Sequence, residues 1–454
     1  MNASLAEEPA GVLIEDDYVV PRGWYTLAAL LIVALFAFVD RQLLTLAAPL
    51  LSKSLHLSDT ELGTVQGLAF AIFTVVAVYP LAWAADRYDR RYVLGFCVLI
   101  WTAGTVACGL AQNFPQLFAA AVAIAAGEAG LAPITMSIVP DLFHGRKRAL
   151  ANGINYFAAY IGVALALAFG GAAIGMLGRV HGELPPGLAQ FEAWRLAFFL
   201  SAVPAPLLLV LIAYSRLRRG QSSPAQQQQA DNAELIRHVR AHRLAIGGIL
   251  AALGFYLLAF GGFFVWLPVI ATRLFGATPE QNGSYMGLAS GIGMIAGVVP
   301  TTYIVGKLMH RIGERAPVRL AWVLMLITTP ILLAFPFVTS SVQLYASLGV
   351  MMFAGCGVGV LVSTILQEMA PQMLRSRFIA LYTIVSGLLS GIAPTIVGSV
   401  SDALGGNRGL LYALTAVALP SWLIGTLVFR LSEKSFARLA EETLRIDGSA
   451  SHKM

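Results

Sequence analysis

Long uninterrupted runs of apolar residues dominate the pattern of hydrophobic and polar positions along the chain. A helix needs about 20 such residues to cross the ~30 Å hydrocarbon core of a bilayer. The runs are continuous rather than alternating, so they predict membrane-spanning helices and not the strands of a membrane barrel. Turn and breaker residues separate the runs. The twelve predicted spans cover residues 24–50, 60–84, 90–112, 115–139, 147–176, 194–215, 243–272, 282–308, 316–338, 341–369, 375–402 and 408–430.

The composition agrees with a membrane protein and excludes a soluble enzyme. Of the 454 residues, 57% are hydrophobic and 12% are charged, whereas soluble domains are about 45–50% apolar and about 25% charged. The sequence has no phosphate-binding loop, H-E-x-x-H motif or catalytic triad, so we expect no enzyme activity, no cofactor and no metal site. Its three cysteines lie in apolar runs and predict no disulfide framework. The acidic first 20 residues are unlike the start of a signal peptide, so we expect no cleavage.

Lysine and arginine residues gather on alternate connectors between the spans. All but six of the 30 lie in one set of segments, which includes both termini. The positive-inside rule therefore predicts that both termini are cytoplasmic, and we expect a bacterial inner membrane. The net charge of +6 then reflects topology and gives no argument for a nucleic-acid partner. The six exceptions are Arg41, Lys53, Arg179, Arg195, Arg273 and Arg408.

The one long connector divides the spans six and six, and the two halves carry repeated features. The connectors after spans 2 and 8, and those after spans 4 and 10, have basic clusters at offsets of 224 and 229 residues. Duplicated halves that meet at a midplane site are typical of secondary transporters. The predicted fold is therefore an all-α membrane protein with twelve transmembrane helices in two six-helix halves around a central cavity. The segments are a cytoplasmic N-terminal segment (1–22), a six-helix bundle (23–215), a linker with an amphipathic helix (216–242), a second bundle (243–430) and a cytoplasmic tail (431–454).

The connector after span 2 carries a recognisable motif. Residues Asp86-Arg87-Tyr88-Asp89-Arg90-Arg91 resemble the loop motif of the major facilitator superfamily, G-x-x-x-D-R-x-G-R-[KR], with Ala82 and Asp89 at its glycine positions. The second copy keeps these glycines as Gly306 and Gly313 but has His310 at the acidic position. Within the superfamily, four stretches resemble the spinster-like transporters. They are Asp40-Arg41, Asp86-Arg87-Tyr88 with Arg90, Gly127-Glu128-Ala129, and Asp141-Leu142-Phe143 before a basic cluster.

The spinster resemblance implies a bacterial homologue that handles lysolipids or sphingoid lipids. One position departs from that family, because the arginine that usually stands seven residues before the span-4 glutamate is replaced by Ala121. A mechanism that uses that arginine therefore does not transfer to this chain.

Three charged residues interrupt the predicted spans, namely Asp40 and Arg41 in span 1 and Glu128 in span 4. A charge inside a bilayer costs about 2.5–3.5 kcal/mol on the mildest scale, so such residues pair or face water. At about 1.5 Å per residue, both carboxylates lie near the midplane. We expect Arg41 to form an ion pair with Glu128 and to be available to substrate, while Asp40 and Glu128 serve proton coupling. A static network of three charges is the alternative.

Two further charged groups lie at the predicted inner ends of the spans. The superfamily resemblance implies that Asp86, Arg87 and Arg90 form a conformational latch against a helix N-terminus in the opposite half, near span 11. A carboxylate at a helix N-terminus gains about 0.3–1 kcal/mol. At the end of span 10, an inner-gate ion pair is predicted within the group Glu368, Arg375 and Arg377.

Polar and aromatic residues in the spans are candidates for the lining of the cavity. A pocket with a polar half and an aromatic half would suit an amphiphile, although aromatic residues in membrane helices more often serve packing. Glycine pairs at Gly287 and Gly291, Gly293 and Gly297, and Gly387 and Gly391 predict close packing between the halves. The cavity candidates are Gln66, Asn152, Asn155, Tyr156, Tyr256, Phe260 and Phe263.

These features predict a proton-coupled secondary active transporter that moves an amphiphilic, lysolipid-like or sphingoid-like substrate by alternating access. The expected partners are membrane lipids, this small-molecule substrate and protons, and we expect a monomer. Two alternatives are a transporter of a small organic anion that Arg41 would bind, and an uncoupled lipid facilitator or scramblase. A channel is disfavoured because no segment resembles a selectivity filter or a ring of charges.

Overall fold

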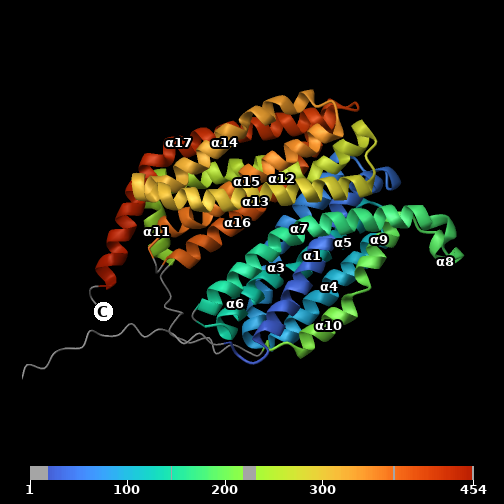
Figure 1. Ribbon diagram of the computed structural model, residues 1–454, viewed down its shortest axis with the longest axis horizontal. Coiled ribbons are helices and arrows are strands. Elements are labelled where there is room, and N and C mark those ends of the chain that lie inside the picture. The colour runs from blue at the N-terminus through green and yellow to red at the C-terminus, as the bar shows by residue number, and fades with distance from the viewer. Residues whose placement is uncertain (1–18, 145, 218–231, 372–373, 452–454) are drawn as a thin grey trace, which may run out of the picture.

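The fold is almost entirely helical over the residues that the computed structural model describes, namely 19–144, 146–217, 232–371 and 374–451. The described residues contain no β-strand, only an isolated bridge between Val19 and Phe143. Figure 1 shows two groups of helices side by side, the first half in blue to green and the second in yellow to red.

The helices of the first half follow the predicted spans, with breaks in three of them. Span 2 includes a π-helical turn, span 4 is broken after Glu128, and span 6 is broken near Val203. The elements are α1 (Gly23–Ser54), α2 (Asp59–Gly63), η1 (Thr64–Leu68), α3 (Ala69–Arg87), α4 (Arg90–Leu110), α5 (Phe114–Glu128), α6 (Leu131–Leu142), α7 (Arg146–Val180), η2 (His181–Glu183), α8 (Pro186–Ala189), α9 (Ala193–Ala202) and α10 (Ala205–Tyr214).

The second half consists of longer continuous helices. A short helix, α11, lies in the connector where an amphipathic helix is expected. The elements are α11 (Asn232–Ala241), α12 (Arg243–Phe275), α13 (Pro279–Ile312), η4 (Gly313–Arg315), α14 (Ala316–Ala334), η5 (Phe335–Phe337), α15 (Ser341–Glu368), α16 (Arg375–Leu404) and α17 (Gly409–Ser451).

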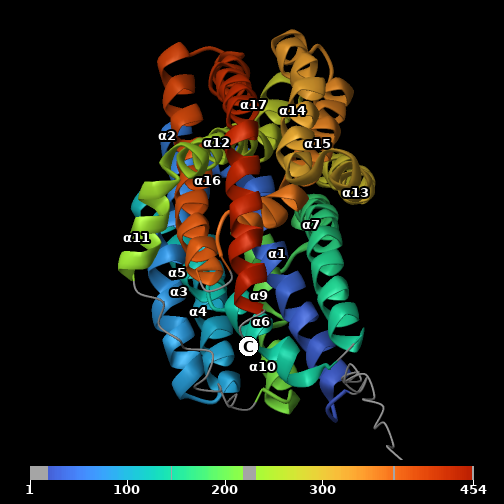
Figure 2. The same cartoon turned by 90° about the vertical axis from the view of Figure 1, so that its left-hand side faces the viewer.

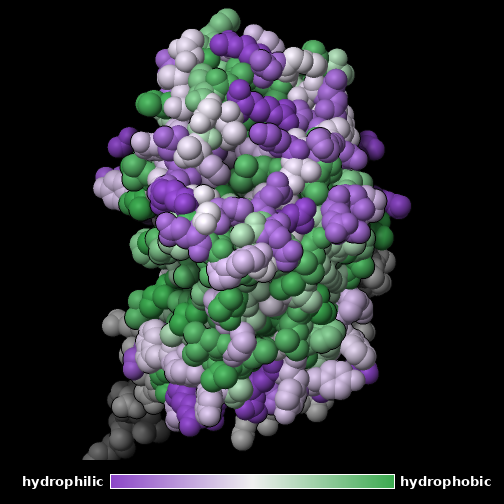
Figure 3. Space-filling view, turned by 90° about the vertical axis from the view of Figure 1, so that its right-hand side faces the viewer, coloured by the Kyte–Doolittle hydropathy of each residue, from purple (hydrophilic) through white to green (hydrophobic). Residues whose placement is uncertain are grey.

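The number of membrane spans agrees with the prediction. Eleven helical segments of the described residues are long and apolar enough to cross a membrane. One of them, Pro279–Phe337, is 59 residues long and contains both α13 and α14, so it accounts for two crossings. Figure 3 shows a broad apolar band on the surface with hydrophilic side chains gathered on both sides of it. The predicted fold class, a twelve-span helical membrane protein, is confirmed.

The ends of the molecule can be told apart by the course of the chain. We call the end where α1 begins and α17 ends the terminal face, and the opposite end the far face (Figures 1 and 2). At the far face the two halves begin equivalent helices with equivalent caps. Ser58 and Glu61 form a capping box at α2, and Thr278 and Gln281 form one at α13. A reciprocal cap provides hydrogen-bond partners for N–H groups in the first turn of a helix. Because both halves have such a cap at the same place, the internal repeat extends to the ends of the spans.

Two seams of small residues join the halves. On one seam, Gly63, Gly67 and Gly398 lie so close to the opposite backbone that an added Cβ would collide with it, and at Gly391 it would collide with Ala71. On the other, Gly171 of α7 packs directly on Gly283 of α13, and Gly287 packs on Ala164. Small residues let helix backbones approach this closely in a membrane.

The glycine predictions are only partly met by these seams. Gly287, Gly291, Gly387 and Gly391 do face the opposite half. Gly293 and Gly297 instead pack on α15 of their own half, against Gly349 and Phe353. The same small-residue spacing serves packing within a half as well as between halves, so spacing alone does not distinguish the two.

The C-terminal segment is helical rather than a separate tail. Helix α17 continues past the predicted end of the last span to Ser451 and packs along α12 and η4. Glu433 anchors it, because its carboxylate accepts hydrogen bonds from Arg319 at 2.6 and 2.9 Å and from the Trp322 indole at 3.0 Å. Residues 431–451 therefore belong to the second half at the terminal face.

Candidate functional site

Asp40 lies inside the first half with one oxygen unsatisfied. Its side chain is 3% exposed, and its Oδ2 accepts a hydrogen bond from Thr105 of α4 at 3.2 Å. Ser201 of α9 also lies beside the carboxylate. Oδ1 has no hydrogen-bond partner among the described residues. An ionised carboxylate in a membrane interior is costly unless it is fully paired, so this group is suited to accept a proton.

Glu128 and Arg41 complete a cluster of charges around Asp40. Glu128 ends α5 where span 4 breaks, and it lies within electrostatic range of both Arg41 and Asp40. One of its oxygens, Oε1, is buried without a described partner. The Arg41 guanidinium is exposed, although it lies in the middle of α1, and stands 5.0 Å from the centre of the Phe70 ring.

The expected direct ion pair between Arg41 and Glu128 is not present between these described side chains. Adjacent residues point about 100° apart around a helix, so the Arg41 side chain points away from that of Asp40. It lies over the Phe70 ring instead of pairing with Glu128. The cluster therefore keeps two incompletely paired carboxylates beside an exposed cation. This arrangement leaves the cation free to meet an anionic group and leaves the carboxylates free to exchange protons.

Gln66 lies in the π-helical turn η1 and is also incompletely satisfied. Its side chain is buried, and neither its amide nitrogen nor its amide oxygen has a described partner. π-Helical turns inside helices occur frequently at functional sites. On α7, Asn152 is exposed and Asn155 is half-buried, while the side chain of Tyr156 lies outside the described part of the chain.

Of the three aromatic cavity candidates in span 7, Tyr256 and Phe263 are buried in the second half and Phe260 is partly buried. Tyr256 is buried and donates a hydrogen bond to the Gly355 carbonyl at 2.7 Å. Phe263 is fully buried with its ring centre 4.7 Å from that of Phe335. Phe260 stacks beside Tyr256 and lies against Gly355. These residues form the core of the second half, because α12 packs closely on α15 and α17.

The arginines of the loop motif make their described contacts within the first half. Arg90 is buried and pairs with Asp141 at 2.8 Å, which ties α4 to the end of span 4. Arg87 lies over the ring of Trp83 on its own helix, with 4.4 Å between its Cζ and the ring centre. The side chain of Asp86 lies outside the described part of the structure. The latch stays a prediction for a state in which the terminal ends of the halves meet.

The charged group at the end of span 10 has other partners than those expected. The Glu368 carboxyl lies against that of Glu314 in η4. Arg375 donates to the Gln367 carbonyl at 3.1 Å and pairs with Asp447 at 3.4 Å. No ion pair joins Glu368 and Arg375, because the continued helix α17 brings Asp447 to the arginine. The side chain of Arg377 lies outside the described residues.

A network of charged residues at the far face was not expected from the sequence. Asp59 is 6% exposed, and its carboxylate accepts two hydrogen bonds from Arg273, at 2.8 and 2.5 Å, and one from Ser401 at 2.6 Å. Asp402 accepts from the backbone N–H groups of Asp59 and Thr60 at 3.0 and 2.8 Å. We call these five residues the far-face lock, since they join α2 to α12 and α16.

The far-face lock and its neighbours close one end of the molecule. A second ion pair, between Arg179 of α7 and Glu280 of α13, crosses the other seam at the same face. Between described residues, all hydrogen bonds and ion pairs that join the two halves lie at the far face. The structure is therefore closed at the far face. Paired acidic and basic residues at equivalent span ends are the signal that would have pointed to this network.

Sequence comparisons relate the chain to membrane transporters. Residues 30–394 match the sequence model of the Major Facilitator Superfamily. The chain is 28% identical over 434 residues to an "MFS-type efflux pump" of Mycolicibacterium smegmatis, which covers 92% of this chain and 94% of that protein. It is 26% identical over 373 residues to "Protein spinster homolog 1" of Xenopus tropicalis, which covers 78% of this chain and 68% of the relative.

A solved structure has the same fold. It is a bacterial homologue of the human lysosomal transporter Spinster in an inward-facing and unoccupied conformation. The two structures superpose with a TM-score of 0.75 at 22% sequence identity, over 94% of this chain and 98% of the other. At this identity the likeness shows the fold alone. Together the comparisons confirm the resemblance that the motifs indicate.

Proposed function

The chain belongs to the major facilitator superfamily, and we propose that it is a proton-coupled secondary active transporter of an amphiphilic, lysolipid-like or sphingoid-like substrate. The observation that carries this proposal is the buried, incompletely paired carboxylate of Asp40 beside Glu128 and the exposed Arg41. Ionisable residues inside a membrane span mark ion pathways and proton relays.

Asp40 and Glu128 are the proposed proton carriers. Each has a buried oxygen that lacks a described partner, so adding a proton relieves the cost of an ionised group there. The two carboxylates also lie within electrostatic range, so the charge state of one acts on the other. Proton binding to this pair, and its release after the halves rock, would couple a proton gradient to transport.

Arg41 is the proposed ligand for the anionic headgroup of the substrate. Its guanidinium is exposed in the middle of a span and takes no carboxylate within ion-pair distance among the described residues. Arginine binds phosphate and carboxylate through a fork of N–H donors. The names of the spinster relatives support a lipid-like substrate, and the name of the mycobacterial relative supports export.

The far-face lock supports alternating access. If the lysine and arginine distribution sets the orientation, the terminal face is cytoplasmic and the structure is inward-facing. Transport then requires the two seams and the lock to open in the opposite state, while the latch of Asp86, Arg87 and Arg90 forms at the terminal face.

We would test the proposal in proteoliposomes by following uptake of a labelled lysophospholipid with and without a pH gradient. The wild-type protein should accumulate the lipid only with the gradient. Asp40→Asn should lose gradient-driven accumulation yet retain exchange of internal for external lipid, because exchange needs no net proton movement.

Competition identifies the substrate class in the same assay. Lysolipids should inhibit uptake, whereas small organic acids should not. If only organic acids inhibit uptake, the substrate is a small organic anion that binds Arg41 and not a lipid. Lipid flux that ignores both the gradient and the Asp40→Asn change would contradict coupling and identify a facilitator.

A further inference from the structure

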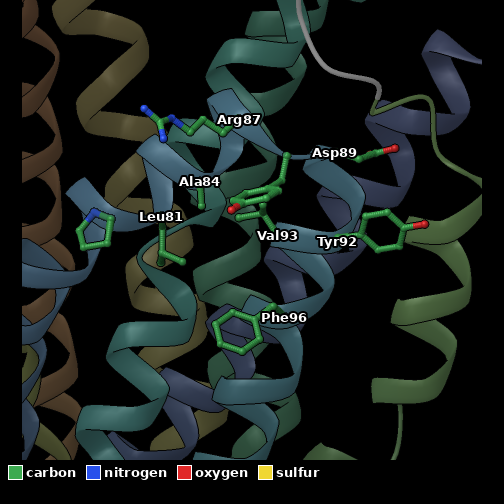
Figure 4. Close-up of a pocket in the computed structure, with 9 residues that line it drawn as sticks. Leu81, Ala84, Arg87, Asp89, Tyr92, Val93 and Phe96 are labelled. Carbon is green, nitrogen blue, oxygen red and sulfur yellow. The ribbon is translucent and has the colours of Figure 1, made fainter.

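A groove lies between α3 and α4 near the terminal face, on the outside of the first half. It has a volume of about 890 Å³. Leu81 and Ala84 of α3 and Val93 and Phe96 of α4 form its apolar walls, and Arg87 stands at its upper rim in Figure 4. The lining on α3 extends over two helical turns from Pro80 to Arg87, which is about 10 Å along the helix.

Arg87 is distinguished from its neighbours by its partners. Arg90 and Arg91 pair with Asp141 and Asp89, each at 2.8 Å. The only described contact of the Arg87 guanidinium is with the face of Trp83. Asp89 also lines the groove, but its charge is balanced by Arg91. The rim therefore offers a cation to an anionic group.

Exposed aromatic residues place this groove at the level of a membrane interface. Trp83, Tyr88 and Tyr92 are 44%, 57% and 78% exposed. Tryptophan and tyrosine gather where lipid headgroups meet the hydrocarbon, because their rings are partly polar. The groove thus has a cation and aromatic side chains at the level of the lipid headgroups. Its walls are apolar deeper within the span.

We propose that the groove binds an acidic phospholipid of the surrounding bilayer. The lipid phosphate binds the Arg87 guanidinium, and one acyl chain lies in the groove against Leu81, Ala84 and Phe96. A soluble anion would use the arginine but would gain nothing from the apolar walls. This site is separate from the Asp40 cluster and does not depend on which substrate is transported.

The site also bears on the latch predicted for Arg87. With its guanidinium on a lipid phosphate beside Trp83, Arg87 would be held at the groove and not in a latch with the second half. Acidic lipid would therefore favour the state in which the terminal ends of the halves are apart.

The test is photo-crosslinking of the full-length protein in liposomes. The probe is phosphatidylglycerol with a diazirine on one acyl chain, diluted in phosphatidylcholine, and labelled peptides are identified by mass spectrometry. Labels should concentrate on residues 80–96 and exceed those from a matched phosphatidylcholine probe. Arg87→Gln should reduce this labelling about fivefold, which corresponds to the loss of one basic contact at the membrane surface.

Two further variants separate a specific site from general lipid contact. Ala84→Trp fills the groove without removing a charge and should abolish the labelling. Lys307→Gln removes a cation that lies over Tyr303 on α13 and should leave the labelling unchanged. Equal labelling by both lipids, or labelling that Arg87→Gln and Ala84→Trp leave intact, would overturn the proposal. Elution volume on size exclusion checks that each variant is folded.

Discussion

At the scale of single residues, the buried carboxylates of Asp40 and Asp59 differ in their hydrogen-bond partners. Both oxygens of Asp59 accept hydrogen bonds, from Arg273 and Ser401. Asp40 has only the hydroxyl groups of Thr105 and Ser201 beside it among the described residues, and its Oδ1 has no hydrogen-bond partner there. A carboxylate with full charge-assisted partners is stable as an anion and holds its neighbours in place. One with few donors is better suited to exchange protons.

The first prediction concerns the far-face lock. Asp59→Asn removes the charge that holds Arg273, so the far-face-closed state should lose stability. Breaking a buried ion pair costs about 3–5 kcal/mol. The Arg273 side chain is 34% exposed, so we expect a smaller shift of about tenfold in favour of far-face opening, equivalent to about 1.4 kcal/mol.

Distances between spin labels at Gln190→Cys and Asn407→Cys, one in each half at the far face, measure this shift. Asp59→Asn should add a population with a longer distance. Glu192→Gln is the matched control, because Glu192 accepts from Ser54 and Trp194 of its own half only. An unchanged distance distribution in Asp59→Asn would show that the lock does not hold the halves together.

The residues of the two sites differ in how far the sequence predicts them. Asp40 and Glu128 are conspicuous because they interrupt apolar runs. Asp59 and Asp402 lie at span ends, where polar residues are ordinary, and their partners are hundreds of positions away in the chain. Arg41 shows a further limit, since its charge is evident but its position over Phe70 depends on packing.

At the scale of elements, the glycine seams decide how closely the halves approach. Gly391 of α16 lies directly on Ala71 of α3 and the Gly67 carbonyl. Gly171 and Gly283 form an equivalent contact between α7 and α13. No side chain fits at these points, so the closed far face requires glycine there.

The second prediction follows from this contact. Gly391→Leu should force α16 away from α3 and favour the far-face-open state, reducing transport at least tenfold. Gly247→Leu is the control, because an added Cβ at Gly247 on α12 meets no atom within 4 Å. Proteoliposome uptake measures the rate, and the spin-label pair described above measures the opening. Normal uptake by Gly391→Leu would show that the seam is not needed in the transport cycle.

Among the elements, the sequence predicts the spans well and their irregularities poorly. Continuous apolar runs define the spans because a bilayer requires them. The sequence predicts a cytoplasmic tail for residues 431–454, whereas α17 continues to Ser451. The helical stripe of Phe436, Leu439 and Ala440, all buried, is the sequence signal for that continuation. The π-helical turn at Gln66 has no comparable pattern in the sequence.

At the scale of the whole molecule, the two halves form a transporter closed at one face. The far-face lock and the two seams hold one end together, and the cluster of Asp40, Arg41 and Glu128 lies within the first half. A few ion pairs and close backbone contacts hold the far face closed. A modest change in free energy at the Asp40 cluster is therefore enough to shift the population from the far-face-closed to the far-face-open state. The proposed function thus combines a proton-coupling site at this cluster with a reversible closure of the far face.

The measurement that tests proton coupling most directly is proton movement driven by the substrate. Proteoliposomes containing a pH-sensitive dye receive lysophospholipid from outside with no initial pH gradient. The account predicts a change of internal pH that depends on the protein, is absent from protein-free liposomes and is lost in Asp40→Asn. Lipid transport by the wild-type protein without any change of internal pH would contradict it.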